Sequence, residues 1–207
     1  PIAGSTGSLV PPKGYLKRLR EICDKHGILL IFDEVITGWG RTGEPFAAQS
    51  FDVTPDIITM AKGITNGVMP LGAVASRESI YDTLLDASPT GAIEFFHGYT
   101  YSAIPPCIAA GLAMQEIIKK ENLFERSKNM SPYFLDGLFS LKDIDIITDI
   151  RGYGMLGGID IKFDERLGKA GFSCFKKLFE VGLSLKATGD CLIVAPPFIC
   201  EEHHIDE

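Results

Sequence analysis

The sequence has no excess of basic residues. Its 207 residues include 20 Lys and Arg against 27 Asp and Glu, which gives a formal net charge of −7. A protein whose main partner is nucleic acid needs a basic face to meet the phosphates, so this balance counts against nucleic acid. Apolar runs are also short, and the best of them, residues 28–32, cannot span a bilayer. No charged segment followed by an apolar one opens the chain, so we expect no secretory signal and no membrane partner.

Cysteine is scarce. The five cysteines are widely spaced and odd in number, so they fit neither a disulfide framework nor a zinc site. We therefore expect a reducing compartment, the cytoplasm. Internal repeats and low-complexity segments are lacking too, and the 45% of hydrophobic residues is ordinary for a globular chain. The chain opens in a loop and closes, at residues 201–207, in what reads as the first turns of a helix. We therefore expect a fragment of a longer protein.

The first part of the chain has the pattern of a parallel α/β fold. Apolar residues recur at helical spacing from Tyr15 to Cys23, and Gly27 ends that helix. The continuous apolar run at residues 28–32 predicts a strand buried on both faces. Two more short strands follow, at residues 56–61 and 72–76. Strands that alternate with helices indicate βαβ units and a parallel sheet.

The second part has a different character, because several of its segments alternate polar and apolar residues as half-buried antiparallel strands do. We expect helices at residues 108–120, 123–138 and 172–181, and strands at 144–150, 157–163, 183–185 and 192–195. The predicted organisation is therefore a parallel α/β part over residues 1–120 and a smaller α+β part over residues 121–207.

Two carboxylates, Asp33 and Glu34, close the first predicted strand. Ligands of open parallel sheets bind just beyond the carboxyl ends of the strands, and carboxylates there are costly to desolvate unless something positive meets them. One interpretation is a helix cap or a surface turn. Another is a Mg²⁺-dependent nucleotide hydrolase that uses Asp33 and Glu34. That enzyme also needs a phosphate loop of the form Gly-x₄-Gly-Lys-Ser/Thr, and the sequence has none.

Lys62 closes the second predicted strand and leads into a loop with glycines at Gly63 and Gly67. Most lysines are simply solvated. A lysine held at a strand end in an apolar setting can instead act as an imine-forming amine. One such lysine beside one carboxylate suits pyridoxal phosphate: the lysine binds the aldehyde, and the carboxylate of Asp33 keeps the pyridine nitrogen protonated.

Three other patterns are weaker. Gly152 to Gly157 match the dinucleotide fingerprint Gly-x-Gly-x-x-Gly, but a strand pattern follows where that fingerprint needs a helix. His203 and His204 are adjacent, point in different directions on a helix and have no third ligand nearby, so a solvated helix start is the better interpretation. Residues 97–102 precede a helix and are either its capped entry or an anion site at its N-terminus.

Two long segments carry a family resemblance. Residues 30–43, Leu-Ile-Phe-Asp-Glu-Val-Ile-Thr-Gly-Trp-Gly-Arg-Thr-Gly, and residues 55–63, Pro-Asp-Ile-Ile-Thr-Met-Ala-Lys-Gly, resemble the signature of class III aminotransferases. The flanks agree over essentially the whole chain. Residues 96–103, Thr188-Gly-Asp and Ala195-Pro-Pro-Phe are similar to the branch that acts on ω-amino acids with pyruvate, such as β-alanine–pyruvate aminotransferase.

The resemblance implies a fold type I, pyridoxal-phosphate-dependent transferase. Residues 1–120 would belong to the large cofactor-binding α/β domain, and residues 121–207 to the small C-terminal domain. Lys62 matches the Schiff-base lysine and Asp33 the carboxylate at the pyridine nitrogen. Val35 matches the residue on the ring face, and Thr100 a hydroxyl that reaches the partner's cofactor phosphate. A homodimer, or a tetramer, and a ping-pong transfer from a β-alanine-like donor to pyruvate are implied.

The sequence departs from the family in places. The phosphate cup and the residue stacked on the ring fall outside these 207 residues, and Ile104 stands where the family usually has His. Lys186 stands where the family has the arginine that clamps the substrate carboxylate, and lysine cannot make the bidentate fork. Lys186 either binds the carboxylate as a point charge or is a bystander in a site for other donors. A catalytically inactive relative that serves as an interaction module is the third functional class.

Overall fold

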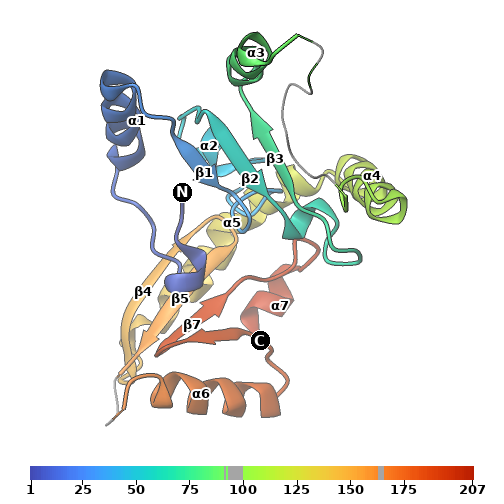
Figure 1. Ribbon diagram of the computed structural model, residues 1–207. Helices are drawn as coiled ribbons and strands as arrows, with labels where there is room; N and C mark the ends of the chain where they lie inside the picture. Colours follow the sequence, from blue (N-terminus) through green and yellow to red (C-terminus); the bar gives the residue numbers. More distant parts are fainter. Residues whose placement is uncertain (91, 93–99, 163–165) are drawn as a thin grey trace.

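The computed structural model describes residues 1–90, 92, 100–162 and 166–207. Two sheets organise these residues, one above the other in Figure 1. The three-stranded sheet has the order β1 (Ile31–Asp33), β2 (Ile57–Met60), β3 (Ala73–Ser76). The four-stranded sheet has the order β4 (Ile147–Tyr153), β5 (Leu156–Ile161), β7 (Cys191–Val194), β6 (Lys186–Thr188).

Helices flank both sheets, and no described helix is both long and apolar enough to cross a membrane. The α-helices are α1 (Tyr15–His26), α2 (Ala47–Ser50), α3 (Glu78–Ala87), α4 (Pro105–Lys120), α5 (Leu123–Ser140), α6 (Lys169–Glu180) and α7 (Glu202–Asp206). Three short 3₁₀ helices are η1 (Gly4–Thr6), η2 (Lys62–Ile64) and η3 (Leu141–Asp143). The sequence pattern predicted α1, α4, α5, α6 and α7 but missed α2 and α3.

The three-stranded sheet is mixed. β1 and β2 are parallel, as predicted, and Asp33 is opposite Thr59 in this pair. β3 is antiparallel to β2, so the expectation of a wholly parallel sheet is wrong for this strand. The reason is the connection from β2 to β3: residues 61–72 contain only the short helix η2, and a strand that returns without a crossover helix runs antiparallel.

The strand expected at residues 28–32 is shorter and less buried than predicted. β1 begins only at Ile31, and its side chains alternate in exposure. Phe32 packs with α1 in a core that also holds Leu16 and Leu30, whereas Ile31 is 55% exposed on the opposite face. One helix thus covers one face of this sheet. Among the described residues nothing equivalent covers Ile31, so the apolar run is buried on one side only.

A buried carboxylate fixes the start of this sheet. Asp56 is 7% exposed; its Oδ2 accepts hydrogen bonds from Leu30 N and Arg20 Nη1, both at 2.7 Å, and Arg77 Nε lies 3.1 Å from its Oδ1. Burial acts to raise the pKa of Asp56, but the Leu30 N–H and the Arg20 guanidinium outweigh it, and the pKa lies below its usual value. Asp56 therefore stabilises the fold as an anion.

Asp56→Asn should lower the free energy of unfolding by about 3 kcal/mol, because Arg20 and Arg77 lose their buried charge partner and Arg20 keeps only the exposed Asp24. A lowered carboxyl pKa stabilises the fold fully above about pH 4 and loses that stabilisation as the pH falls through the folded value. Urea titrations at neutral and acidic pH should show the difference between wild type and variant shrinking on acidification. A difference that is the same at every pH would contradict this role.

The four-stranded sheet is antiparallel throughout, as the alternating segments predicted. α5 and α6 pack on it, and its core contains Phe134, Leu138, Met155 and Ile159. The last hairpin is shifted from the prediction: β6 is Lys186–Thr188 rather than residues 183–185. Phe163, the last residue of the expected strand 157–163, lies outside the described residues.

The Gly-x-Gly-x-x-Gly segment is a β-hairpin between β4 and β5. Gly152 and Gly157 are paired across it, and Gly154 turns the chain with φ 61°. A methyl group on Gly157 would lie 2.4 Å from Leu138 Cδ2, so the glycine lets α5 pack against the hairpin. No helix opens here, which confirms that this segment is not a dinucleotide fingerprint.

Candidate active site

Asp33 is the last residue of β1 and is exposed at the carboxyl end of that strand. Its Oδ1 accepts a hydrogen bond from Val35 N at 3.0 Å, which orients the carboxylate. Among the described residues it forms no ion pair. Asp33 Oδ2 is thus available to a ligand with a hydrogen-bond donor.

Lys62 follows β2 and is the first residue of η2. Its side chain is exposed, and within the described part of the chain its amine has no hydrogen-bond or ion-pair partner. Its backbone has φ 46°, in the left-handed region that non-glycine residues seldom occupy. Such strained residues cluster at functional sites.

The sheet topology brings these two residues to one edge. Asp33 is opposite Thr59 in the parallel pair, Glu34 N donates to Thr59 O at 2.9 Å, and Lys62 comes three residues after Thr59. The carboxyl ends of adjacent parallel strands therefore present one unpaired amine and one oriented carboxylate. That donor set fits pyridoxal phosphate, which needs an amine for its aldehyde and an anion for its ring nitrogen.

Glu34 has a different function from its neighbour. It is fully buried, its Oε2 accepts hydrogen bonds from Thr37 Oγ1 at 2.6 Å and Ala47 N at 2.8 Å, and its Oε1 accepts one from Ala48 N at 2.7 Å. These bonds satisfy the free N–H groups at the start of α2. The Mg²⁺ site proposed for Asp33 and Glu34 is not favoured, since Glu34 points into the protein and its oxygens are already bonded.

The other predicted site residues are spread over the chain. Val35 is half-buried directly after the two carboxylates. Thr100 is exposed in a turn before α4, and residues 97–99 of the same segment lie outside the described residues. α4 begins at Pro105 with Ile104 as its N-cap, so the hydroxyls of Thr100 and Ser102 do not cap it.

Lys186 opens β6 and is exposed. It is opposite Ile193 in the hairpin, and no hydrogen bond or ion pair of its amine is found in the described part of the chain. The turn that follows is structural: Asp190 Oδ2 accepts a hydrogen bond from Gly168 N at 2.8 Å and Oδ1 one from Gly171 N at 2.9 Å, which caps α6. These bonds lower the pKa of Asp190.

Two residues beside the site lie in the signature segment 30–43, but the sequence assigned them no role. Trp39 lies in the loop of residues 38–43 after β1 and contacts Gly63, the residue that follows Lys62. In the same loop, Arg41 Nη1 donates to Met155 O at 2.9 Å and Pro196 O at 2.7 Å, and its guanidinium stacks on Phe198. Burial lowers the pKa of Arg41 to about 10. The loop thus joins the Lys62 edge to the four-stranded sheet, through contacts between residues far apart in sequence.

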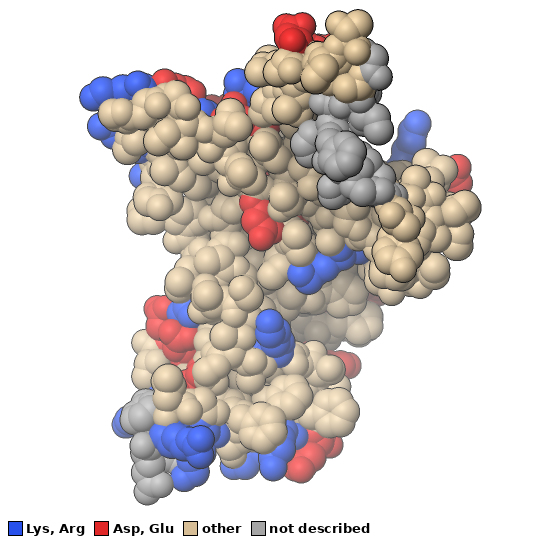
Figure 2. Space-filling view, viewed as in Figure 1, with Lys and Arg blue, Asp and Glu red and all other residues tan. Residues whose placement is uncertain are grey.

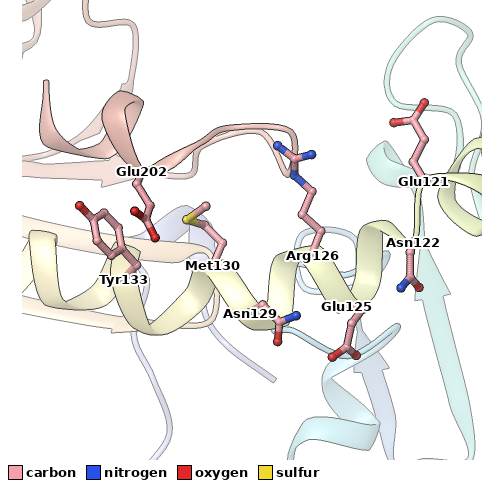
Figure 3. A pocket seen from close by; sticks show the side chains of 8 residues that line it. All are labelled: Glu121, Asn122, Glu125, Arg126, Asn129, Met130, Tyr133 and Glu202. Atoms are coloured by element: carbon pink, nitrogen blue, oxygen red, sulfur yellow. The ribbon is translucent and has the colours of Figure 1, made fainter.

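A shallow surface pocket lies away from this edge. It has a volume of about 430 Å³ and is found between α5 and α7, lined by Glu121, Asn122, Glu125, Arg126, Asn129, Met130, Tyr133 and Glu202 (Figure 3). Arg126 donates to Ile199 O and Cys200 O, and Tyr133 to Asp206.

In the described ranges no group of His, Cys, Asp and Glu could hold a metal, His203 and His204 included. Acidic and basic side chains are interspersed on the face in Figure 2, without a broad basic surface.

Known proteins are similar to this chain in sequence and in fold. The class III aminotransferase family matches residues 1–207. The chain is 51% identical to an omega-aminotransferase of Caulobacter vibrioides, covering all of this chain and 47% of that protein. It is 46% identical to a beta-alanine–pyruvate aminotransferase of Pseudomonas aeruginosa, covering all of this chain and 46% of that protein.

The solved structures agree. The omega transaminase from Pseudomonas jessenii, in complex with PMP, superposes with a TM-score of 0.93 at 30% identity, over 99% of this chain and 47% of that one. The chain thus spans about half the length of these relatives, and it has the fold of the matching part of a fold type I pyridoxal-phosphate transferase. On its sequence and on its structure, this chain belongs to the class III aminotransferase family.

Proposed function

We propose that the full-length protein is a pyridoxal-phosphate-dependent transaminase. It moves an amino group from an ω-amino acid or a related amine, of the β-alanine type, to a keto acid such as pyruvate. The observation that carries the proposal is the pair of Lys62 and Asp33 at the ends of two adjacent parallel strands. Relatives named for β-alanine or ω-amino acids with pyruvate, each 46% identical, support the choice of donor and acceptor.

Each residue of the site has a separate proposed role, which follows from its chemistry. When bound, pyridoxal phosphate supplies an aldehyde and an electron-accepting ring. Lys62 Nζ would hold the aldehyde carbon and later carry the proton that moves between the donor carbon and the cofactor. Asp33 would keep a proton on the ring nitrogen, and Val35 would pack on the ring face. Lys62 has no competing partner among the described residues, which leaves its amine available for this role.

A spectroscopic and kinetic experiment tests this function. The purified full-length protein should show a visible absorption band that borohydride removes, and β-alanine with pyruvate should give the parallel double-reciprocal lines of a ping-pong reaction. A protein without bound cofactor and without amino transfer would overturn the proposal and favour the inactive interaction module.

We also propose a homodimer in the cytoplasm. Thr100 is exposed, and its neighbour Tyr101 is 87% exposed, so this segment is accessible to a second subunit. There Thr100 would bind the cofactor phosphate of the partner. All five cysteines are free, which supports a reducing compartment. Light scattering on the full-length protein tests the assembly, and a monomer with full cofactor occupancy would contradict it.

The ammonium group of Lys186 would bind the donor's carboxylate as a point charge. Lys186→Ala should weaken the use of β-alanine by about 1–3 kcal/mol in kcat/KM, the scale of a lost hydrogen bond to a charged group. Lys186→Arg should keep or improve it, because the guanidinium regains the bidentate geometry. The measurement compares kcat/KM for β-alanine with that for an uncharged amine of similar size. Equal effects on both donors would mean that Lys186 does not read the carboxylate and that the site takes donors of another class.

A further inference from the structure

The backbone at Lys62 is in a conformation that needs support. Its φ of 46° is unfavourable for a residue with a side chain. The backbone hydrogen bonds of the turn are long: Ile64 N to Ala61 O at 3.2 Å, Thr65 N to Lys62 O at 3.3 Å and Asn66 N to Gly63 O at 3.4 Å. Such a conformation persists where the surroundings over-determine it. The direction of the Lys62 side chain therefore depends on what packs against the turn.

Trp39 packs against this turn at Gly63. A methyl group placed on Gly63 would lie 2.5 Å from Trp39 Cβ and 3.0 Å from Trp39 Cγ. The φ of Gly63 is not positive, so the backbone there would accept alanine. The three heavy atoms nearest to that methyl group all belong to Trp39, so Trp39 is what disfavours alanine at position 63.

The position of Trp39 is itself fixed. Its backbone N–H donates to Pro45 O at 2.6 Å, its ring lies 5.4 Å from that of Phe46, and its φ is 63°. The next residue, Gly40, accepts a hydrogen bond from the buried Ser127 Oγ at 2.7 Å. Trp39 Nε1 is buried without a hydrogen-bond partner among the described residues, so the indole is held by packing. The group facing Gly63 is therefore a rigid wall and not the free end of a flexible side chain.

The helix α4 also packs against the turn. A methyl group on Gly111 of that helix would lie 3.2 Å from Leu71 Cδ2 and 3.7 Å from Ile64 O. Both Trp39 and α4 thus pack against the turn that begins at Lys62, which limits how far a shift at Gly63 can relax.

We propose that Trp39 is a positioning residue for Lys62: its contact with Gly63 holds the left-handed backbone that presents the amine at the carboxyl edge of β1 and β2. This inference rests on the proposed role of Lys62 as the cofactor-binding lysine. It adds a residue whose effect is transmitted through the backbone, since Trp39 reaches Lys62 through Gly63.

The test is Gly63→Ala in the full-length holoenzyme, with Gly72→Ala as the matched control. Both glycines lie in the connection from β2 to β3 and lack a positive φ, but a methyl group on Gly72 would meet only Met60 O, at an ordinary 3.5 Å. The methyl group on Gly63 must move roughly 1 Å to reach van der Waals distance from Trp39. A misplacement of that size costs on the order of 10²-fold in a step that depends on position.

The readouts are the rate at which borohydride fixes the cofactor to Lys62, the midpoint pH of the visible band, and the unfolding temperature. Gly63→Ala should slow fixation about 10²-fold and shift the midpoint, while Gly72→Ala should match wild type. Trp39→Gly should shift the midpoint in the same direction, and Trp39→Phe, which keeps the contact, should restore it. Trp39→Gly suits the φ at this position. In that background Gly63→Ala should add little further effect.

Three outcomes would overturn the inference. Gly63→Ala could lower only the unfolding temperature and match Gly72→Ala in fixation rate and midpoint, which would make the contact merely structural. The effect of Gly63→Ala could be the same with and without the Trp39 side chain. If Gly63→Ala does not fold, a Trp39→Gly protein with a wild-type midpoint would be decisive against it. Wild type without any band would instead remove the proposed function, which separates the two failures.

Discussion

Lys62→Ala in the full-length protein should lower transamination by about 10⁴-fold or more, since it removes the amine that we propose binds the cofactor and carries the proton. The fold should be unaffected, because the Lys62 side chain is exposed and no contact of its amine is found among the described residues. The measurement is kcat/KM for β-alanine with pyruvate, beside the unfolding temperature.

The control for this change is Lys119→Ala, which removes another exposed lysine, in the last turn of α4. It should transaminate as wild type does. A Lys62→Ala protein that retains normal turnover would show that the amine acts elsewhere or that another lysine binds the cofactor, and the assignment of the site would be wrong.

Asp33→Asn should lower kcat on the order of 10²–10³-fold, the scale for removing one preorganised electrostatic partner. Asparagine keeps an oxygen that can accept the hydrogen bond from Val35 N, so the turn after β1 should remain. It lacks the negative charge, so the cofactor's ring nitrogen loses its proton and the ring accepts electrons less well. The expected result is a folded protein that binds the cofactor and turns over slowly.

Glu34→Gln gives the matching contrast. Glu34 is buried and accepts two hydrogen bonds from the start of α2 and one from Thr37, so its replacement should lower the unfolding temperature. The transamination rate of Glu34→Gln, per folded molecule, should exceed that of Asp33→Asn. Near-normal turnover in Asp33→Asn would assign Asp33 a structural role only, and the two adjacent carboxylates would then have been interpreted wrongly.

The adjacency of Asp33 and Lys62 could be predicted because it depends on a local pattern and one general rule. Each residue ends a short apolar run, and parallel strands end at the same edge of the sheet. The direction of β3 was mispredicted because it was inferred from the general alternation of strands with helices and not from its own connection to β2. In the sequence, only the lack of a helical pattern in residues 61–72 indicated the direction of β3.

Contacts between distant residues set the features that the sequence could not reveal. α6 begins at Lys169 because Asp190, in the β6–β7 turn, accepts the N–H groups of Gly168 and Gly171. Trp39 beside Gly63 is another such contact, and no spacing rule links the two residues. The burial expected for residues 28–32 depends on what covers the second face of the sheet, and Ile31 is open among the described residues.

The central claim is that Lys62 is the cofactor-binding lysine of a transaminase, and peptide mapping tests it most directly. The full-length protein would be reduced with borohydride and digested, and the peptide that carries the cofactor would be sequenced by mass spectrometry. The account predicts a single modified peptide, with the cofactor on Lys62. A modification on any other lysine, Lys186 included, or a protein from which borohydride recovers no modified peptide, would contradict it.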